Sequence, residues 1–216
     1  MWPVLWIGLF VSGGQMAESP FIAYTDRMKL IERWSLMRNT RHENVAEHSL
    51  ETAIIAHMLA VIEKVKFGAD VDPEKAAAAA LYHDASEVFT GDLPTPIKYK
   101  NRILTAEYKK IEANAEELLL ETLPEELRPY CREFLLSESL DPEIRRIVKD
   151  ADTISAYIKC IVETASGNRD FLSAERKIRE TLTKRSRPAL DYFLETFIGS
   201  FERDLDNLMS DDGRKD

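Results

Sequence analysis

The sequence predicts an all-α protein, a single-domain bundle of six to eight helices. Apolar side chains recur at steps of three and four residues along most of the chain, which is the spacing of one helix face. The helix-start sequence Asp-Pro-Glu occurs at both 72–74 and 141–143, with Asp as the N-cap residue and Pro at the first helical position. No alternating apolar and polar run of any length predicts a strand.

The composition is that of one globular domain with a sizeable core, at 216 residues, 44% hydrophobic and 31% charged. The formal net charge of −9 argues against a nucleic-acid polymer as partner, because backbone binding requires Lys and Arg to neutralise phosphates. A small phosphate ester remains compatible, since it needs only a local positive cluster. Cys131 and Cys160 are too few for a disulfide framework, and we expect a cytoplasmic protein.

Residues 1–15 are expected to form an apolar extension that is disordered or not part of the functional protein. Met1 to Val11 resembles the core of a secretory signal, but no Lys or Arg precedes it, and Ser12-Gly13-Gly14 is a poor cleavage site. The apolar run is also too short to span a bilayer. We expect the functional domain at 16–209, with Met16 as a candidate translation start, followed by a polar tail at 210–216.

The first expected helix begins near Pro20 and ends at Arg33-Trp34, and a cationic loop follows up to Glu43. The second begins near Val45 and ends at Gly68, a residue suited to the left-handed position after a helix. The expected inward faces are Phe21, Tyr24, Met28 and Ile31 in the first helix, and Val45, His48, Thr52, Ile55, Leu59 and Ile62 in the second.

The third expected helix starts at Asp72, carries alanines at 76–80 that let another backbone approach closely, and ends before the loop at 91–96. The later helices follow the same apolar spacing, and in the one that opens at 141 we expect Asp150 to face solvent and Asp152 to lie at the edge of the inward stripe. The expected later faces are Leu104, Tyr108, Ile111, Ala115, Leu118 and Thr122; Ile144, Val148, Ala151, Ser155, Ile158 and Val162; Phe171, Ala174, Ile178 and Leu182; and Leu190, Phe193, Phe197, Phe201, Leu205 and Leu208.

Four side chains on separate segments are candidates to bind one divalent cation. His83 and Asp84 are adjacent, so an imidazole nitrogen and a carboxylate oxygen can both reach one ion, and His48 and Asp152 supply the further donors that a site needs. The donor set suits Mn, Co, Fe, Ni or Zn, and a metal there would polarise phosphoryl oxygens and lower the pKa of bound water. The alternative is structural: a hydrogen-bonded core histidine, and a helix that happens to end in His-Asp.

Glu87 follows His83 by one helical turn and is expected to project toward the same ion without binding it. It is a candidate general base for the attacking water or general acid for the leaving oxygen. The alternative is a structural partner of His83 at helical spacing.

The order of these ligands is similar to that of the HD-domain metal-dependent phosphohydrolases. Four strings make the resemblance more specific, and together they resemble the bacterial 5'-deoxynucleotidases of the YfbR type. The similarity runs from about Met16 to near the C-terminus. The strings are Ile31–Asn39 (IERWSLMRN), Glu43–Leu50 (ENVAEHSL), Tyr82–Glu87 (YHDASE) and Gly91–Pro96 (GDLPTP).

The resemblance implies an HD-type bundle, usually a homodimer, that hydrolyses deoxyribonucleoside 5'-monophosphates with one metal per subunit, such as cobalt or manganese. It implies selectivity for deoxyribose with tolerance of the base. Arg33 matches the residue that orients the phosphate, a role suited to a guanidinium that is always charged. Trp34 matches the bulky neighbour placed against the sugar. The remaining substrate-binding candidates are Asp84 and the sugar loop Asp92, Leu93, Pro94 and Thr95.

Two other functions remain open at this stage. One is an HD phosphohydrolase acting on another nucleotide, such as a ppGpp-like or cyclic substrate, against which the Arg33-Trp34 and GDLPTP strings argue. The other is a non-catalytic nucleotide-sensing module, against which the presence of Glu87 beside four candidate ligands argues.

Overall fold

The computed structural model describes residues 18–98 and 100–210 of the chain. Within these residues all regular structure is helical, apart from one isolated antiparallel bridge between Glu32 and Asn44, so the all-α prediction is confirmed. The predicted extension at 1–15 lies outside the described residues, as does the predicted tail beyond Ser210.

Seven described helices have eight or more residues, in agreement with the six to eight predicted. These are α2 (Val45–Phe67), α3 (Pro73–Tyr82), α6 (Arg102–Glu121), α7 (Arg128–Leu135), α8 (Pro142–Ala165), α9 (Leu172–Lys184) and α10 (Pro188–Phe197). The shorter elements are α1 (Phe21–Asp26), α4 (Glu87–Thr90), α5 (Thr95–Lys98) and α11 (Leu205–Ser210), with 3-10 helices η1 (Arg27–Leu30), η2 (Arg169–Phe171) and η3 (Ile198–Glu202).

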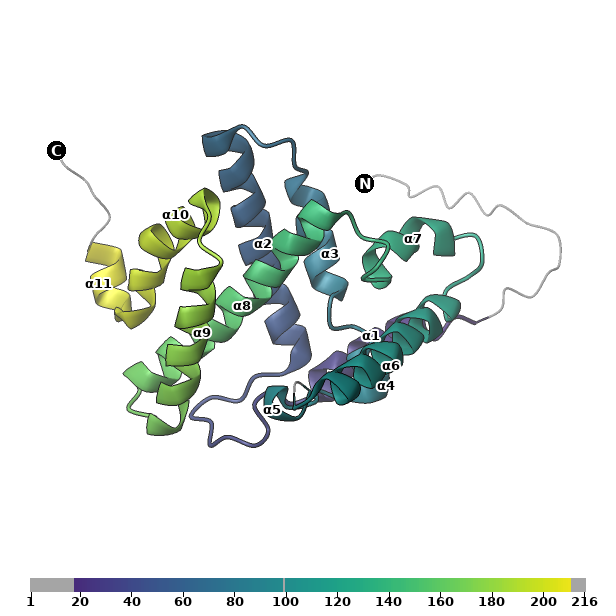
Figure 1. The fold of residues 1–216 in the computed structure, drawn as a ribbon, viewed down its shortest axis with the longest axis horizontal. Coiled ribbons are helices and arrows are strands. Elements are labelled where there is room, and N and C mark those ends of the chain that lie inside the picture. Colours follow the sequence, from purple (N-terminus) through teal and green to yellow (C-terminus); the bar gives the residue numbers. More distant parts are fainter. Residues whose placement is uncertain (1–17, 99, 211–216) are drawn as a thin grey trace, which may run out of the picture.

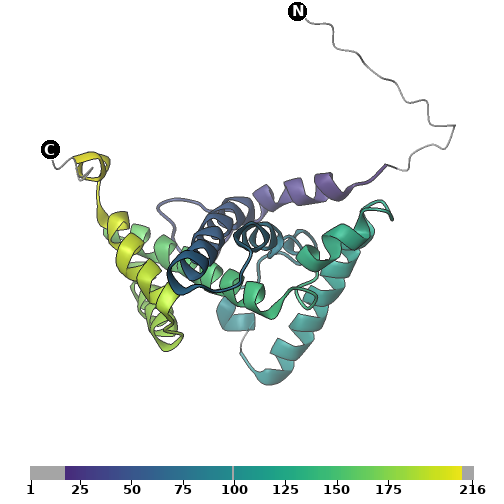
Figure 2. The same ribbon diagram turned by 90° about the horizontal axis from the view of Figure 1, so that it is seen from above.

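The long helices α2 and α8 cross at the centre of the bundle, with α3 beside α2 (Figure 1). Both helices bury small side chains in the same core cluster, Ala56 and Ala60 in α2 and Ala76 and Ala80 in α3, which allows their backbones to approach closely. Seen from above, α9 and α10 lie on one side of this centre and α6 and α7 on the other (Figure 2). The close approach of the three central helices brings their polar residues toward one place.

Local sequence signals set where the central helices begin. The Asn44 side chain accepts a hydrogen bond from the Glu47 backbone N–H at 3.0 Å, and Glu47 accepts one in return, which forms a capping box. Gly68 ends α2 with a φ of 70°, and Asp72 and Asp141 cap α3 and α8 as predicted. The first turn of α2, where His48 lies, is therefore held in register by its own sequence.

Two predicted faces are wrong in part. In α6, Ile111 and Leu118 are half exposed, and Leu119 and Leu120 are buried in their place. A strict seven-residue repeat drifts relative to a straight helix, so the buried stripe of a 20-residue helix moves off that repeat. The predicted last helix is also not continuous: it breaks near Gly199, and Leu205 and Leu208 are exposed. Glycine is a poor helix former, which favours the break.

The structure also differs from prediction at Asp150 and in the segment from His83 to Glu87. Asp150, expected to face solvent, is 3% exposed, because Arg185 and Arg187 from the connection between α9 and α10 cover that face of α8 and pair with it. The segment from His83 to Glu87 is not one continuous helix, since α3 ends at Tyr82 and α4 begins at Glu87 after a turn.

Candidate functional site

Three elements bring the four candidate ligands together: the first turn of α2, the turn after α3 and the middle of α8. His48, His83 and Asp84 offer donor atoms that all lie within 4.8 Å of one another. Nε2 of His83 is 3.2 Å from Oδ2 of Asp84, and Nε2 of His48 is 3.7 Å from the same oxygen. Oδ1 of Asp152 lies 3.0 Å from Nε2 of His48 and 4.0 Å from Nε2 of His83. The two Nε2 atoms and the two carboxylates therefore face one small space.

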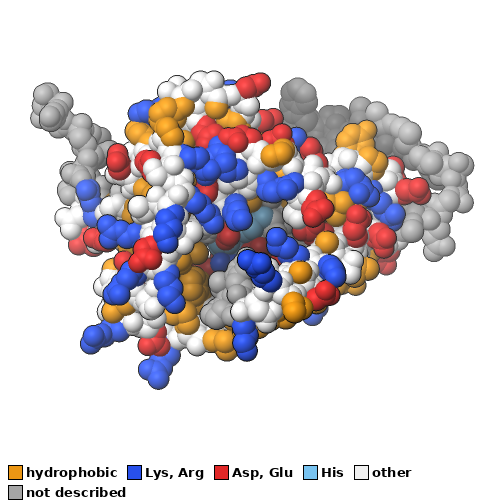
Figure 3. All heavy atoms as spheres, viewed as in Figure 1, with side chains coloured by type: hydrophobic (Ala, Val, Ile, Leu, Met, Phe, Trp, Pro, Cys, Tyr) orange, Lys and Arg blue, Asp and Glu red, His pale blue; other side chains and the backbone are white. Residues whose placement is uncertain are grey.

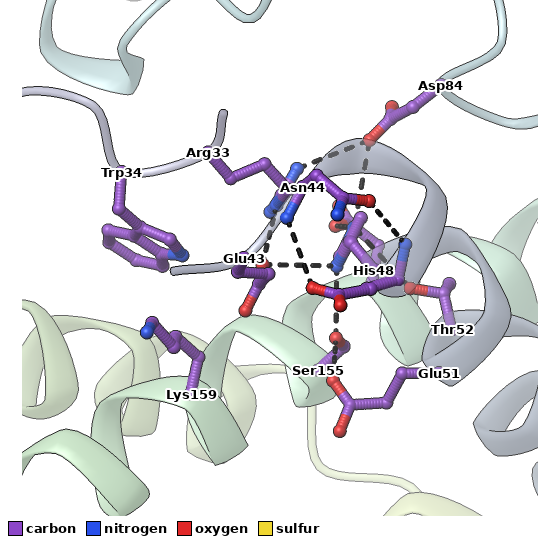
Figure 4. A network of polar contacts seen from close by, with 12 residues as sticks. Arg33, Trp34, Glu43, Asn44, His48, Glu51, Thr52, Asp84, Ser155 and Lys159 are labelled. Carbon is purple, nitrogen blue, oxygen red and sulfur yellow. Dashed lines mark hydrogen bonds and ion pairs between the residues drawn. The ribbon is translucent and has the colours of Figure 1, made fainter. Parts of the chain in front are cut away.

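Each imidazole is oriented by a contact at its other nitrogen. Nδ1 of His83 lies 2.7 Å from the carbonyl oxygen of Ala80, which can only accept, so Nδ1 carries the proton in the neutral ring. Nδ1 of His48 lies 3.0 Å from Oγ of Ser155, whose hydroxyl donates to Glu51 at 2.6 Å. The serine oxygen is therefore an acceptor for Nδ1–H (Figure 4). In the neutral rings, each Nε2 therefore carries the lone pair that a metal requires.

The buried atoms of the site fit a cation. Nε2 of His83 is buried and lies 3.2 Å from Oδ2 of Asp84 without the geometry of a hydrogen bond, and Nε2 of His48 faces a carboxylate oxygen of Asp152. Burial lowers the pKa of His83, but the charges of Asp84 and Asp152 outweigh this and raise it to about 9. Burial raises the pKa of Asp84, whereas His83, His48 and Arg33 together hold it well below its usual range. The centre therefore favours positive charge, and its nitrogen and oxygen donors suit a divalent transition metal.

Arg33 is placed at the edge of this centre by two acidic partners. Its Nε donates to Oε1 of Glu43 at 2.8 Å, and its Nη1 lies 3.3 Å from Oδ2 of Asp84. The side chain is 13% exposed. Burial would lower the pKa of Arg33, but Asp84, Asp152 and Glu43 raise it above its ordinary value. A fixed cation beside the centre suits an anionic ligand.

Glu87 lies next to the centre without joining the ligand group. Burial, followed by the charges of Asp84 and Asp92, raises the pKa of the Glu87 carboxyl to about 9. Its Oε2 is buried and has no hydrogen-bond partner. This raised pKa favours the protonated form of the carboxyl group in the metal-free protein.

The sugar-loop candidates, from Asp92 to Thr95, follow directly after α4 and Gly91. Burial raises the pKa of Asp92, against the opposing charge of Arg33. Leu93 and Pro94 are half-buried and follow directly, and Thr95 is the first residue of α5. The predicted loop therefore ends in a short helical turn, which Pro96 permits because proline is tolerated in a first turn.

Trp34 is held in an uncommon backbone conformation, with a φ of 56° in the left-handed region. Its ring lies 5.3 Å from the ring of Phe171, and its Nε1 is buried without a hydrogen-bond partner. A bulky residue persists in this conformation only where its surroundings hold it there, and such residues cluster at functional sites.

The residues that sequence reasoning missed are the ones that orient the others: Glu43, Glu51, Thr52 and Ser155. The hydroxyl of Thr52 lies 3.4 Å from Nε2 of His48. Glu51 and Ser155 stand three residues after His48 and Asp152, so helical spacing alone places each near a candidate ligand.

The surface over α2 and α8 is hollowed, and a histidine side chain is visible in the hollow (Figure 3). Several Lys and Arg side chains lie around its rim, together with acidic ones. The chain has a formal net charge of −9, so these Lys and Arg side chains are the available partners for an anion near the hollow. They suit a small anion.

Comparison with known proteins gives consistent matches over most of the chain. The family model described as "5'-deoxynucleotidase YfbR-like" matches residues 20–201. A 5'-deoxynucleotidase of Vibrio cholerae is 53% identical over 193 residues, which are 89% of this chain and 100% of that protein. The 5'-deoxynucleotidase YfbR of Escherichia coli is 47% identical over 196 residues, 91% of this chain and 98% of that protein.

Solved structures support the fold at lower identity. An HD-domain phosphohydrolase from Listeria innocua has a TM-score of 0.73 and 24% identity, covering 84% of this chain and 87% of that one. The cyanophage S-2L HD phosphohydrolase DatZ, bound to dA and one catalytic Zn2+ ion, has a TM-score of 0.54 and 22% identity, covering 82% and 96%. At this level of identity the two likenesses show a common fold.

Proposed function

The chain belongs to the YfbR-like family of 5'-deoxynucleotidases, and from this premise we propose that its histidine–aspartate centre hydrolyses deoxyribonucleoside 5'-monophosphates to deoxynucleoside and phosphate. The protein is a phosphoric monoester hydrolase, as its relatives at 47–53% identity are named. The observation that carries the proposal is the convergence of two histidine Nε2 atoms and two carboxylates beside a buried arginine.

One divalent transition metal is proposed to bind His48, His83, Asp84 and Asp152. The donors are nitrogen and oxygen without cysteine, which suits Co, Mn or Zn, and DatZ holds a catalytic Zn2+ ion. Such an ion would polarise the phosphoryl oxygens and lower the pKa of a bound water. The His48–Ser155 and His83–Ala80 contacts keep both Nε2 atoms available for it.

Arg33 is proposed to orient the 5'-phosphate. Glu43 accepts from Nε at 2.8 Å and Asp84 lies 3.3 Å from Nη1, so the guanidinium is fixed beside the proposed metal ligands. A fixed guanidinium binds a phosphate through parallel hydrogen bonds and stabilises charge that develops in the transition state.

Glu87 is proposed to move a proton. Its raised pKa, about 9, suits donation to the leaving ester oxygen at neutral pH. A group that is protonated at the working pH and lies near the reacting atoms can act as general acid, worth ~10²–10⁴ in rate.

Trp34, Asp84 and the residues from Asp92 to Thr95 are proposed to contact the nucleoside. Trp34 adjoins Arg33, so a phosphate held by Arg33 brings the ribose within reach of the indole. A rigid ring there would reject a 2'-hydroxyl, which would give selectivity for deoxyribose and tolerance of the base.

We further propose a cytoplasmic homodimer whose activity resides in residues 16–209. Among the described helices, α2 is long and apolar enough to cross a membrane, but 56% of that stretch is buried in the bundle, which supports a core helix. The match of the family to residues 20–201 supports the domain bounds.

The test is phosphate release from 5'-dAMP, 5'-AMP and 3'-dAMP, with EDTA and then with single metals restored. We expect 5'-dAMP to be hydrolysed fastest, 5'-AMP more slowly and 3'-dAMP not at an appreciable rate, with activity lost in EDTA and recovered with a divalent transition metal. Arg33→Ala should depress activity on both 5'-nucleotides alike. Equal rates on 3'-dAMP and 5'-dAMP, or full activity in EDTA, would contradict the proposal.

A further inference from the structure

The segment from Ser35 to His42, here called the 35–42 loop, leaves the site and returns to it, and Glu163 of α8 holds its far end. At the base, the Arg33 backbone N–H donates to the carbonyl of Glu43 at 2.9 Å. At the tip, the Glu163 carboxylate is fully buried, with 0% exposed, and accepts from the backbone N–H of Thr40 at 2.9 Å and its hydroxyl at 2.7 Å. These partners lie 123 positions apart in the chain.

Two further side chains, Lys159 and Asn168, each bridge Glu163 and a backbone carbonyl of the 35–42 loop. Lys159 donates to Glu163 at 2.5 Å and to the carbonyl of Arg41. Asn168 donates to Glu163 at 2.7 Å and to the carbonyl of Arg38 at 2.6 Å. Burial alone would raise the pKa of Glu163, but the hydrogen bonds that it accepts, from Lys159 and Asn168 first, lower it below its ordinary value. A charged carboxylate with its hydrogen bonds satisfied inside the protein holds the loop backbone in one place.

Trp34 is held in place by the 35–42 loop and by Phe171. Its carbonyl accepts hydrogen bonds from the Met37 backbone N–H at 2.9 Å and from the Asn39 side chain at 3.2 Å, and both donors belong to the 35–42 loop. Its indole packs on Phe171, which is fully buried and follows Asn168 by three residues. The backbone of Trp34 is therefore held by the 35–42 loop, and its ring packs on η2, the short helix that follows α8 (Figure 4 shows Lys159 below the indole).

We infer that Glu163 is a positioning residue for sugar selection, which holds the Trp34 indole rigid by clamping the 35–42 loop. The inference rests on the proposed function, in which the indole borders the ribose. A side chain excludes an added hydroxyl by steric overlap only if it cannot move aside. If the residues that support it become mobile, this discrimination is lost. Glu163 lies away from the ligands and touches no proposed substrate group.

The experiment compares the ratio of kcat/KM for 5'-dAMP to that for 5'-AMP in four proteins: wild type, Glu163→Gln, Trp34→Ala and the double variant. Glutamine keeps the size of the side chain, but it is uncharged, and its NH2 group cannot accept the hydrogen bonds that the carboxylate accepts from Thr40, Lys159 and Asn168. We expect Glu163→Gln to lower the ratio about threefold or more. This corresponds to the lower end of the coupling free energies between residues that share contacts. Its kcat on 5'-dAMP and its bound metal should stay within about twofold of wild type.

The matched control is Asp150→Asn, which neutralises another buried carboxylate of α8 that pairs with Arg185 and does not contact the 35–42 loop. It should lower the melting temperature and leave the ratio unchanged. If Glu163→Gln is insoluble, Thr40→Val removes one of its partners from the loop side, and the same criteria apply.

The double variant separates positioning from other effects. If Glu163 acts through Trp34, adding Glu163→Gln to Trp34→Ala lowers the ratio no further. An unchanged ratio in Glu163→Gln, an equal fall in both backgrounds, or an equal fall in Asp150→Asn would each overturn the inference while leaving the proposed function intact. A wild-type enzyme that treats both nucleotides equally would overturn the proposed selectivity and this inference together.

Discussion

Replacing Ser155 with alanine should weaken metal binding without removing any candidate ligand. The Ser155 hydroxyl is 3.0 Å from Nδ1 of His48 and 2.6 Å from a carboxylate oxygen of Glu51, in the buried interior between α2 and α8. It is the acceptor that keeps the imidazole proton on Nδ1. Without it, the ring can place its proton on Nε2 and donate to Asp152, which lies 3.0 Å away. Metal binding would then have to displace that proton.

The size of the effect follows from this hydrogen bond. Leaving a buried polar group unsatisfied costs ~1–3 kcal/mol, and at 1.4 kcal/mol per tenfold this corresponds to a weakening of roughly five- to 150-fold. Contacts that orient metal-bound histidines typically contribute about 10–100-fold to metal affinity. We therefore expect the Kd for Co2+ or Mn2+ to rise about 10–100-fold in Ser155→Ala.

The assay is a metal titration of the metal-free protein in competition with a chromophoric chelator, at fixed pH. Ser49→Ala is the matched control, because Ser49 adjoins His48, is 2% exposed and has a buried hydroxyl without a hydrogen-bond partner. Its Kd should stay within about twofold of wild type. A Kd for Ser155→Ala that is equally close to wild type, or an equal weakening in Ser49→Ala, would refute the reasoning.

Four further outcomes are expected. Asp84→Ala should lose both metal and turnover, whereas Glu87→Ala should keep the metal and lose turnover; metal analysis showing the reverse would contradict the division of roles. Wild type should prefer 5'-dAMP over 5'-AMP by roughly five- to 150-fold, estimated from the ~1–3 kcal/mol cost of an unpaired buried hydroxyl. Trp34→Ala should narrow this preference; equal kcat/KM ratios in wild type and variant would instead assign the selection to the sugar loop. The pKa of Glu163 is lowered from its ordinary value of 4.5, so the charged carboxylate stabilises the folded protein. This stabilisation is fully present above pH 4.5 and is lost progressively as the pH falls below that value. Thermal melts should therefore show Glu163→Gln less stable than wild type at neutral pH, with a gap that narrows in acid; a constant gap would exclude the charge as the cause. A chain starting at Met16 should match the full chain in kcat/KM, and a clear loss would assign a role to the extension.

The local features of this protein could be predicted from its sequence because they depend on residues within about one helical turn. Asn44 with Glu47, Asp72 and Asp141 cap helices through contacts two or three residues away, and Gly68 supplies a left-handed residue after α2. The donor chemistry of the candidate ligands is likewise a property of residue type. Helical spacing turned His48 inward, and that side chain is 1% exposed.

The geometry of the site was decided by tertiary structure, because its contacts join residues far apart in the chain. Ser155 meets His48 across 107 positions and Thr40 meets Glu163 across 123, and no local pattern selects such pairs. Asp150 has the sequence context of an exposed acid, yet arginines from another connection bury it. Whether a polar side chain is solvated, paired or aimed at a ligand depends on which distant element packs over it, and that depends on the sum of all the helix contacts rather than on its neighbours in sequence.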